Sequence, residues 1–289
     1  QLHTGAPRAD WFGPMGAVCA CACNQHDLRH VLAVPVEAIM EGECQLNEEW
    51  TNCALQDRQR LTRNTYMLEF SLPNGEKPLG LPTCACLQCR IPDFKGMDEK
   101  PVIRPYTPVS TNQTTGTFVL LVKVYPQGQM STFMENMPLG NALEFRFVDD
   151  GRKPRYPFGC KHLVLLAGGT GITPMIQVMH AVLGNKADET QITLLFGNHS
   201  PGDILLKAEL DSWAARSAGR LKVVHIVPEA SIGEKSKWTG EIGHMDKKLI
   251  AKHCPKPKKG QVKVMVCGPP PMYEAMCGKR ENPDLSGVL

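Results

Sequence analysis

Hydrophobic positions follow two different patterns along the chain, and the pattern changes near the middle. Between residues 54 and 147 the apolar positions form short alternating runs broken by Pro, Gly and Asn. Several short alternating runs separated by turn residues indicate an antiparallel β-barrel. The runs lie at residues 66–71, 102–107, 118–125 and 142–147, and only residues 131–137 are patterned as a helix.

The second half of the chain has longer apolar runs. Residues 163–167 are uninterrupted apolar positions, as is typical of a parallel strand that is buried on both faces. Similar runs follow at residues 192–196, 221–227 and 262–266, and residues 205–216 between them are helical in pattern. Strands that alternate with helices predict a doubly wound parallel α/β sheet.

A glycine-rich turn ends the first of these strands. Gly168–Gly171 reads GGTG, and apolar positions at helical spacing follow it. Thr173 suits the N-cap of this helix, and Pro174 suits its first position. Glycines let a backbone approach a pyrophosphate at a helix N-terminus. Because the third glycine of the GxGxxG fingerprint is missing, this turn alone fits either a nucleotide site or an ordinary α/β turn.

A second special turn ends the run at residues 262–266. It reads CGPPP over Cys267–Pro271, and residues 272–277 after it are patterned as a helix. Both turns therefore follow the carboxyl ends of strands. In an open α/β sheet, ligands bind at that edge. The sequence thus predicts a nucleotide site between the two turns.

The two patterns divide the chain into domains. We expect a barrel domain at residues 49–150 and an α/β domain at residues 158–289, and the polar, Pro-containing residues 149–157 suit a linker between them. Residues 1–48 form an N-terminal extension whose role the sequence does not indicate. A length of 289 residues is enough for two domains of ordinary size.

Charge excludes one class of partner. The formal net charge is +3 with Lys and Arg scattered evenly, so we expect no nucleic-acid surface. The basic run KPKK at residues 256–259 suits a solvated loop. A mildly basic face is also compatible with an acidic protein partner, whose reaction rate would then depend on salt. No stretch of the sequence has the length of a membrane-spanning helix.

The twelve cysteines raise the question of a metal site. Cys84, Cys86 and Cys89 have the spacing of half a zinc or iron–sulfur site, but the family resemblance given below implies a barrel strand over residues 84–91. Alternation would then direct Cys84 and Cys86 to one face as small apolar residues, so we predict no metal there. The CACAC segment at residues 19–23 stays open between metal binding and oxidation. Many unpaired thiols favour a reducing compartment.

Five motifs together resemble one protein family. They are RPYTP at residues 104–108, KVYPQGQMS at 123–131, AGGTGITPM at 167–175, DILLK at 203–207 and CGPPPM at 267–272. In this order and spacing, from about Cys53 to Gly278, the chain resembles the NADH–cytochrome b5 reductases among the ferredoxin reductase-like flavoproteins. The resemblance implies a barrel that binds FAD and a sheet that binds NADH.

The resemblance also assigns roles to residues of the first domain. Arg104 would clamp the FAD pyrophosphate, Tyr106 would lie against the flavin ring, and the Thr107 hydroxyl would reach the ring. Lys123 would lie beside flavin and nicotinamide, although a strand-edge lysine that extends into solvent has the same pattern. Gly128–Ser131 would hold the diphosphate, although a capping serine without a ligand would look the same.

Other roles belong to the second domain. Thr173 would place a hydroxyl near the flavin, and Cys267 would position the nicotinamide, with a plain buried thiol as the alternative. Asp203 would accept hydrogen bonds from the adenosine ribose and repel the phosphate of NADPH, or would cap a helix that starts at Ile204. We therefore expect a preference for NADH. Thr107, Lys123 and Cys267 are the expected catalytic residues.

The complete set of predicted cofactor-binding residues includes members of both domains. It consists of Arg104, Pro105, Tyr106, Thr107, Leu121, Lys123, Gly128, Gln129, Met130, Ser131, Gly168, Gly169, Thr170, Gly171, Thr173, Asp203, Cys267, Gly268, Pro269, Pro270 and Met272.

Two departures from the family pattern limit these assignments. The segment after Phe145, RFVDDGRKPRYPFG, is shorter than its counterpart, so contacts to the FAD adenine are not transferred. The sequence stops at Leu289, whereas the family continues into a last strand with a terminal aromatic residue near the flavin. We expect a chain without that strand to be less stable and to discriminate less between cofactors.

The function that follows is an FAD-dependent oxidoreductase. We expect it to take a hydride from NADH and to pass single electrons to a haem protein such as cytochrome b5, as a monomer. Residues 198–203 and 277–279 suggest the mitochondrial branch, and the resemblance suggests association with a mitochondrial or endoplasmic reticulum membrane through a segment outside this sequence. The alternatives are a nitrate reductase-like reductase module, or a non-catalytic nucleotide- or metal-binding module.

Overall fold

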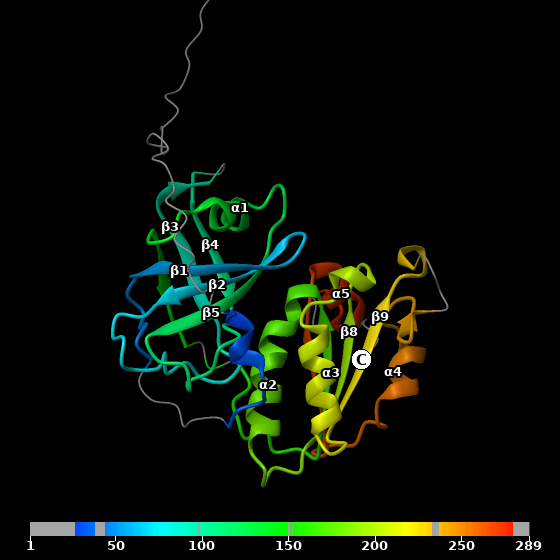
Figure 1. Ribbon diagram of the computed structural model, residues 1–289. Helices are drawn as coiled ribbons and strands as arrows, with labels where there is room; N and C mark the ends of the chain where they lie inside the picture. Colours follow the sequence, from blue (N-terminus) through cyan, green and yellow to red (C-terminus); the bar gives the residue numbers. More distant parts are fainter. Residues whose placement is uncertain are drawn as a thin grey trace, which may run out of the picture.

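The computed structural model describes residues 27–37, 44–96, 99–149, 151, 153–232, 237–279 and 289. It contains two sheets of different kinds, and the fold class predicted from the sequence is confirmed (Figure 1). Residues 19–23, with the CACAC segment, lie outside the described residues. Within the described part of the chain, no helix is both long and apolar enough to cross a membrane.

The first sheet is antiparallel and has the strand order β4-β3-β6-β1-β2-β5. Its end strands approach each other where the chain leaves β4: the Val109 N–H donates to the Val119 carbonyl (2.8 Å), and the Val119 N–H donates to Ser110 Oγ (2.8 Å). These bonds close the sheet into a barrel. The strands are β1 Thr51–Thr62, β2 Thr65–Ser71, β3 Leu87–Lys95, β4 Pro101–Tyr106, β5 Thr117–Lys123 and β6 Ala142–Arg146, and helix α1 spans Gln129–Asn136.

Three phenylalanines fill the centre of the barrel. Phe70, Phe118 and Phe145 are fully buried on three different strands, with ring centroids 5.0 to 5.7 Å apart. Aromatic pairs at this spacing add to the free energy gained from burial alone. Because these rings come from inward positions of alternating strands, the period-two pattern in the sequence is explained.

The second sheet is parallel and has the order β10-β9-β8-β7-β11. Its strands are β7 His162–Gly168, β8 Gln191–Gly197, β9 Leu221–Val227, β10 Glu241–Ile242 and β11 Val262–Cys267. The helices are α2 Ile172–Gly184, α3 Lys207–Arg216, α4 Lys247–His253 and α5 Pro270–Cys277, and short 3-10 turns occur at Leu28–Leu32, Gly169–Gly171, Pro201–Asp203 and Glu229–Ser231.

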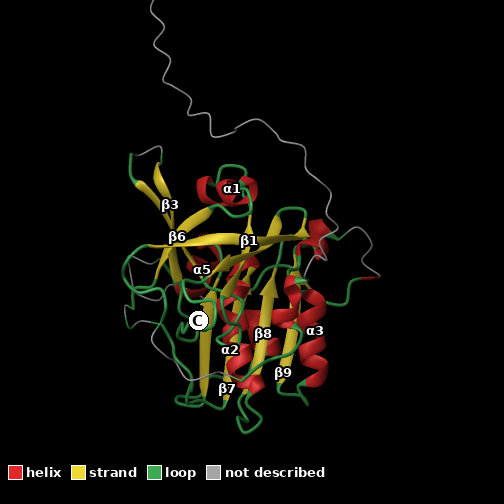
Figure 2. Cartoon of the chain, turned by 60° about the vertical axis from the view of Figure 1, so that its left-hand side comes forward, coloured by secondary structure: helices red, strands yellow, loops and turns green. Residues whose placement is uncertain are grey.

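Helices cover both faces of this sheet. Along β7, Leu163 and Leu165 belong to one hydrophobic cluster with α2 and α3, whereas Val164 and Leu166 belong to another with α4 and α5. A strand buried on both faces needs apolar residues at every position, which explains the uninterrupted run in the sequence. The carboxyl ends of the parallel strands point toward the barrel (Figure 2).

Three local predictions were wrong. Helix α2 begins at Ile172 with Gly171 as its N-cap, because the glycines wind into a 3-10 turn first, so Thr173 is not the cap. Helix α3 begins at Lys207 rather than Ile204, because Leu206 has a left-handed backbone (φ 55°) that ends the preceding turn. Strand β3 begins at Leu87, so the expected strand over residues 84–91 starts three residues late.

Candidate cofactor-binding site

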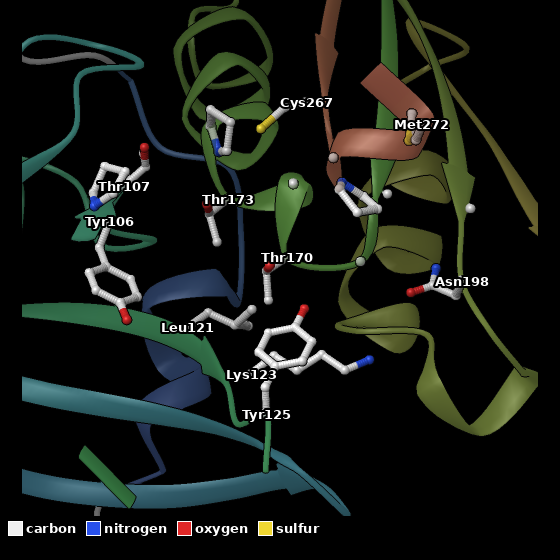
Figure 3. A pocket seen from close by; sticks show the side chains of 18 of the residues that line it. Tyr106, Thr107, Leu121, Lys123, Tyr125, Thr170, Thr173, Asn198, Cys267 and Met272 are labelled. Atoms are coloured by element: carbon white, nitrogen blue, oxygen red, sulfur yellow. The ribbon is translucent and has the colours of Figure 1, made fainter. Parts of the chain in front are cut away.

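A single large cavity lies between the barrel and the carboxyl edge of the parallel sheet. Its volume is about 930 Å³, which is at the upper end of the usual range for small-molecule sites. Every predicted cofactor-binding residue lines it except Asp203 and Pro270. Figure 3 shows side chains of the barrel and of both special turns around this space. The cavity therefore joins motifs that are more than a hundred residues apart.

The end of β4 forms one wall. Arg104 is exposed, lines the cavity and donates from Nη1 to the Ile103 carbonyl (2.8 Å). Tyr106 and Thr107 follow it and are half-buried. Burial raises the pKa of the Tyr106 phenol well above its usual range, so the hydroxyl stays protonated. Tyr106 can present an aromatic surface and a hydrogen-bond donor but not a base.

Strand β5 forms the floor. Leu121, Lys123 and Tyr125 occupy alternate positions and line the cavity together (Figure 3). Lys123 has no hydrogen bond or ion pair to any residue that the structure describes, and its ammonium extends along the cavity. Tyr125, which extends the line beyond the strand, was missed in the sequence although the period of two predicts it. Its exposed fraction is 53%.

The turn that enters α1 lies next to this floor. Gly128 is the N-cap of α1, and a Cβ there would overlap Ser131 Oγ. The Ser131 hydroxyl accepts from the Tyr125 N–H (3.2 Å) and donates to the Gly128 carbonyl (3.1 Å). The serine therefore holds the turn in shape. An anion at this place would be bound by backbone groups at the start of the helix.

The two special turns pack directly against each other. A Cβ on Gly171 would lie 2.5 Å from the Cys267 carbonyl carbon and 2.8 Å from the Gly268 nitrogen. A Cβ on Gly168 or Gly268 would lie 2.6 Å from Met272 Sδ. Gly171 is thus required by turn-to-turn contact with backbone, whereas Gly168 and Gly268 face a flexible methionine side chain that can move. The sequence suggested a different reason, namely close approach to a pyrophosphate.

Gly169 has a different role. Its φ is +52°, in the left-handed region that favours glycine, and a Cβ there would meet nothing within 4 Å. The open space above it belongs to the cavity, which Thr170 and Thr173 also line. Gly169 is therefore the glycine of this turn whose freedom shapes the ligand-facing backbone.

Asp203 lies outside the cavity lining. Its carboxylate is buried, accepts from Ser200 Oγ (2.8 Å) and lies 3.6 Å from Arg63 Nε of the β1–β2 turn. The predicted helix cap is wrong, because Asp203 ends a 3-10 turn and caps no helix, whereas its predicted role toward the adenosine ribose stays a prediction. Pro270 is the first residue of α5 and also lies outside the lining.

Charge in the cavity has one sign. Arg104, Lys123 and Lys153 line it, and no carboxylate belongs to its described lining. His199 and His244 add two further nitrogen donors or acceptors. Lys153 comes from the linker after β6, so this shortened segment does reach the cavity. A cavity whose described charged lining residues are all cationic suits ligands that carry phosphates.

Several lining residues were missed in the sequence. Gly197 ends β8 and Asn198 follows it, and Ile226 and Pro228 lie at the end of β9. Both sets lie at carboxyl ends of parallel strands, where the rule that located the two special turns also applies. The remaining missed lining residues are Cys84, Cys86, Gln127, Pro174, Gly243 and Met245.

The cysteine cluster at residues 84–89 does not form a joint site. Cys84 lies in a turn with φ 66°, and its Sγ approaches the Pro174 carbonyl (3.8 Å), whereas Cys89 is buried in the barrel core. Burial raises the pKa of the Cys84 thiol to about 12, so the free thiol is protonated at neutral pH. No cluster of three metal-ligating side chains occurs among the residues that the structure describes.

The cavity fits FAD and NADH together. The barrel side offers an aromatic ring, a cation and a helix N-terminus, which are the groups that hold a flavin and its diphosphate. The sheet side offers the open backbone at Gly169 and the ends of four parallel strands, which suit a dinucleotide. Cys267 and Thr173 lie where these two halves meet (Figure 3).

Comparison with known proteins agrees with this division. The oxidoreductase FAD-binding domain model matches residues 52–147, and the oxidoreductase NAD-binding domain model matches residues 165–278. The NADH-cytochrome b5 reductase 2 of Aspergillus clavatus is 39% identical over 243 residues, which cover 83% of this chain and 72% of that protein. Its counterpart from Scheffersomyces stipitis is 37% identical over 244 residues, which cover 84% of this chain and 78% of that protein.

Solved structures show the same fold. The cytochrome b5 reductase domain of Ulva prolifera nitrate reductase superposes with a TM-score of 0.71 at 30% identity, over 80% of this chain and 92% of that one. The CS-b5R domains of human Ncb5or superpose with a TM-score of 0.67 at 24% identity, over 78% of this chain and 64% of that one. The chain is thus an oxidoreductase with FAD- and NAD-binding domains, and it belongs to the NADH-cytochrome b5 reductase family.

Proposed function

We propose that the protein transfers electrons from NADH, through FAD, to cytochrome b5 or a similar haem protein. One observation carries this proposal: flavin-type and nucleotide-type binding groups line one continuous cavity whose charged lining residues are all cationic. Bound FAD would supply the chemistry, because a flavin accepts electrons in pairs and releases them singly.

The residues of the chain would bind, orient and exclude water. Arg104 and the start of α1 would neutralise the FAD diphosphate, and Tyr106 would pack against the flavin ring. Lys123 would attract the nucleotide, and Cys267 would help to place its nicotinamide. Hydride transfer requires no protein base, so alignment of the two cofactors is the main contribution of the protein.

The first test is an absorbance spectrum of the purified protein followed by anaerobic addition of NADH. We expect flavin bands that NADH bleaches, and reoxidation of the reduced protein by cytochrome b5. If NADH bleaches the flavin but cytochrome b5 does not reoxidise it, cytochrome b5 is not the acceptor, and only the oxidation of NADH by the flavin is supported. A protein that cannot be loaded with FAD would refute the proposal.

We propose in addition a preference for NADH over NADPH. Asp203 ends the 3-10 turn that follows β8, so its negative charge lies near the carboxyl edge of the sheet, where the nucleotide would bind. Arg63 partly offsets that charge, which predicts a modest preference. The measurement is kcat/KM with each nucleotide. Equal values would contradict the preference, and Asp203→Thr should bring unequal values closer.

A second arrangement is favoured by the Ulva nitrate reductase neighbour, whose reductase domain is matched over 92% of its length. The chain would then deliver electrons inside a larger protein. Sequencing of the complete transcript separates the two arrangements, because a haem or molybdenum domain in the same reading frame would support the second.

We also propose a monomeric protein associated with a mitochondrial or endoplasmic reticulum membrane. The support is the resemblance of residues 198–203 and 277–279 to the mitochondrial branch. Fluorescence of a full-length fusion protein in cells tests the location, and light scattering of the purified protein tests the oligomeric state. A diffuse cytosolic fusion or a stable dimer would overturn the respective part.

A further inference from the structure

A segment that precedes both domains packs between them. We call residues 27–37 the strap. It lies before residue 52, where the first family match begins. Figure 1 shows it in dark blue beside β5 and α2. Its short 3-10 helix, Leu28–Leu32, begins with Asp27 as a side-chain cap. Because the strap has defined structure and touches both domains, its contacts bear on how the domains are placed.

The strap is bonded to the barrel at both of its ends. The Leu28 N–H donates to Gln59 Oε1 (2.9 Å), and Gln59 Nε2 donates back to Asp27 Oδ1 (3.0 Å). At the other end, Gln113 Nε2 donates to the Glu37 carbonyl (3.3 Å). Gln59 belongs to β1 and Gln113 to the loop before β5. The strap is therefore attached to two separate parts of the barrel.

The middle of the strap is bonded to the α/β domain. The buried Trp213 of α3 donates from Nε1 to the Leu32 carbonyl (2.9 Å). Arg216, one turn further along α3, donates from Nη2 to the Ala33 carbonyl (2.7 Å). Trp213 has an exposed fraction of 1%, so its indole bond is shielded from water. Buried hydrogen bonds of this kind are costly to leave unmade.

A buried histidine holds the strap further along. The Val36 N–H donates to Nδ1 of His180 on α2 (3.1 Å). The imidazole is packed edge-on against Trp213, with ring centroids 4.8 Å apart. Since Nδ1 accepts a hydrogen bond, the proton of the neutral ring lies on Nε2. The histidine therefore presents a fixed acceptor to the strap backbone.

Apolar contacts reinforce this position. Leu28 and Leu32 have no exposed surface, and their hydrophobic cluster contains Met67 and Val119 of the barrel together with Ile176 of α2. The strap thus contributes to the one cluster that both domains share. Removal of the two leucines from water gives the strap a fixed place in the interface.

Among the residues that the structure describes, direct polar links between the domains are few. Gln177 of α2 donates from Nε2 to the carbonyls of Pro108 (2.6 Å) and Ser110 (2.8 Å). The Arg63–Asp203 pair is 3.6 Å long, and its arginine has an exposed fraction of 77%. Exposed pairs of this kind contribute little. The strap accordingly supplies a large part of the specific contacts that fix the two domains.

We propose that the strap is a positioning element that fixes the barrel and the parallel sheet at the spacing required for hydride transfer across their shared cavity. The two cofactor sites lie on different domains, and a displacement of about 1 Å can cost on the order of a hundredfold in rate. This inference rests on the proposed function, because only a reaction between the two sites depends on their spacing.

Gly184 provides a test that leaves the cavity untouched. A Cβ on this last residue of α2 would overlap the Val36 carbonyl group and the Glu37 nitrogen, so Gly184→Ala displaces the strap. Gly75→Ala is the matched control, because a Cβ there meets nothing within 4 Å. Trp213→Phe is a second variant that keeps an aromatic ring, removes the bond to Leu32 and reduces the buried volume at this position.

Three quantities are measured on the FAD-loaded full chain. Hydrogen exchange of the Val36 amide reports release of the strap, small-angle X-ray scattering reports the separation of the domains, and stopped-flow absorbance reports flavin reduction by NADH. For Gly184→Ala we expect faster exchange, a larger radius of gyration and at least tenfold slower reduction, with FAD still bound. Trp213→Phe should change the exchange rate, the radius of gyration and the reduction rate in the same directions but by smaller amounts. Gly75→Ala should match the wild type in all three.

The outcomes separate the two proposals. Faster exchange with an unchanged radius and an unchanged reduction rate would overturn the positioning role, because the strap would then add only stability. A wild-type protein that binds FAD but is not reduced by NADH would refute the proposed function instead. In that case the scattering measurement still tests the strap. An unchanged radius of gyration in Gly184→Ala would contradict its role in setting the spacing of the domains.

Discussion

The contact between the two special turns can be tested by a single methyl group. In Gly171→Ala the new Cβ would lie 2.5 Å from the Cys267 carbonyl carbon, and real Cβ atoms essentially never lie within 3.0 Å of another atom. The turns must therefore separate by more than 0.5 Å, the difference between these two distances, because the Cys267 carbonyl oxygen lies closer still to the new Cβ. Because the obstructing atoms are backbone, no side-chain rotation can make room.

The cost follows from overpacking. Methyl groups forced into packed sites typically cost about 1 to 3 kcal/mol. For domains of roughly this size, each kcal/mol lowers the melting temperature by about 2 to 4 °C. We therefore expect a decrease of about 2 to 12 °C, confined to the α/β domain. Because Cys267 moves with its turn, we also expect flavin reduction by NADH to slow by about tenfold to a hundredfold.

The assay combines calorimetry with anaerobic stopped-flow reduction. Gly202→Ala is the control in the same domain, because a Cβ there meets nothing within 4 Å. FAD content should stay at the wild-type level, since the flavin groups of the barrel are not touched. Gly171→Ala with unchanged melting and an unchanged reduction rate would refute the turn-to-turn explanation of this glycine.

Three further predictions concern charge. Lys123→Met should raise the KM for NADH by about 10- to 100-fold, which is the usual effect of losing a charge-assisted hydrogen bond. Lys123→Arg should have a KM between those of the wild type and Lys123→Met. A KM in Lys123→Met equal to that of the wild type would contradict the role of this lysine. Arg63→Gln should lower the ratio of kcat/KM for NADPH to kcat/KM for NADH by up to about fivefold, because the negative charge of Asp203 is then no longer offset by its exposed partner. An unchanged ratio would show that the Arg63–Asp203 pair does not influence selectivity. Burial lowers the pKa of His180 from 6.5 to about 3. Between pH 6.5 and pH 3 only the unfolded chain binds a proton at this histidine, so the free energy of unfolding decreases as the pH is lowered. Urea unfolding should show a loss of about 2 kcal/mol between pH 7 and pH 5 that His180→Gln abolishes; an equal loss in the variant would assign it to other groups.

The sequence predicted the fold and most of the site because both depend on short-range patterns. Alternation located β2, β4, β5 and β6 but not β1 or β3, and apolar runs located β7, β8 and β9. The carboxyl-edge rule placed Gly168–Gly171 and Cys267 at one site, and the cavity confirms that they lie together. Applied to β8 and β9 as well, the same rule would have found Asn198 and Pro228.

What the sequence could not predict depends on contacts between distant segments. Asp203 was assigned to the ribose, but its carboxylate is held by Ser200 and by Arg63, and Arg63 comes from the other domain. Gly171 was explained by a ligand, but the atom nearest to its missing Cβ belongs to the turn at Cys267. In each case the residue was identified, and the partner that determines its role is far away in the chain.

The division of the site between two domains explains why distant contacts matter here. The barrel has its own core around Phe70, Phe118 and Phe145, and the parallel sheet has its own core on the face covered by α4 and α5, while the cluster on its other face is shared with the barrel. Each domain can therefore shape its half of the cavity without the other. The spacing between the halves depends on the interface alone, where Gln177 and the strap supply buried or shielded contacts. Variants of the interface should therefore change reduction by NADH before they change binding of FAD, whereas variants of the barrel wall such as Tyr106→Ala should do the reverse.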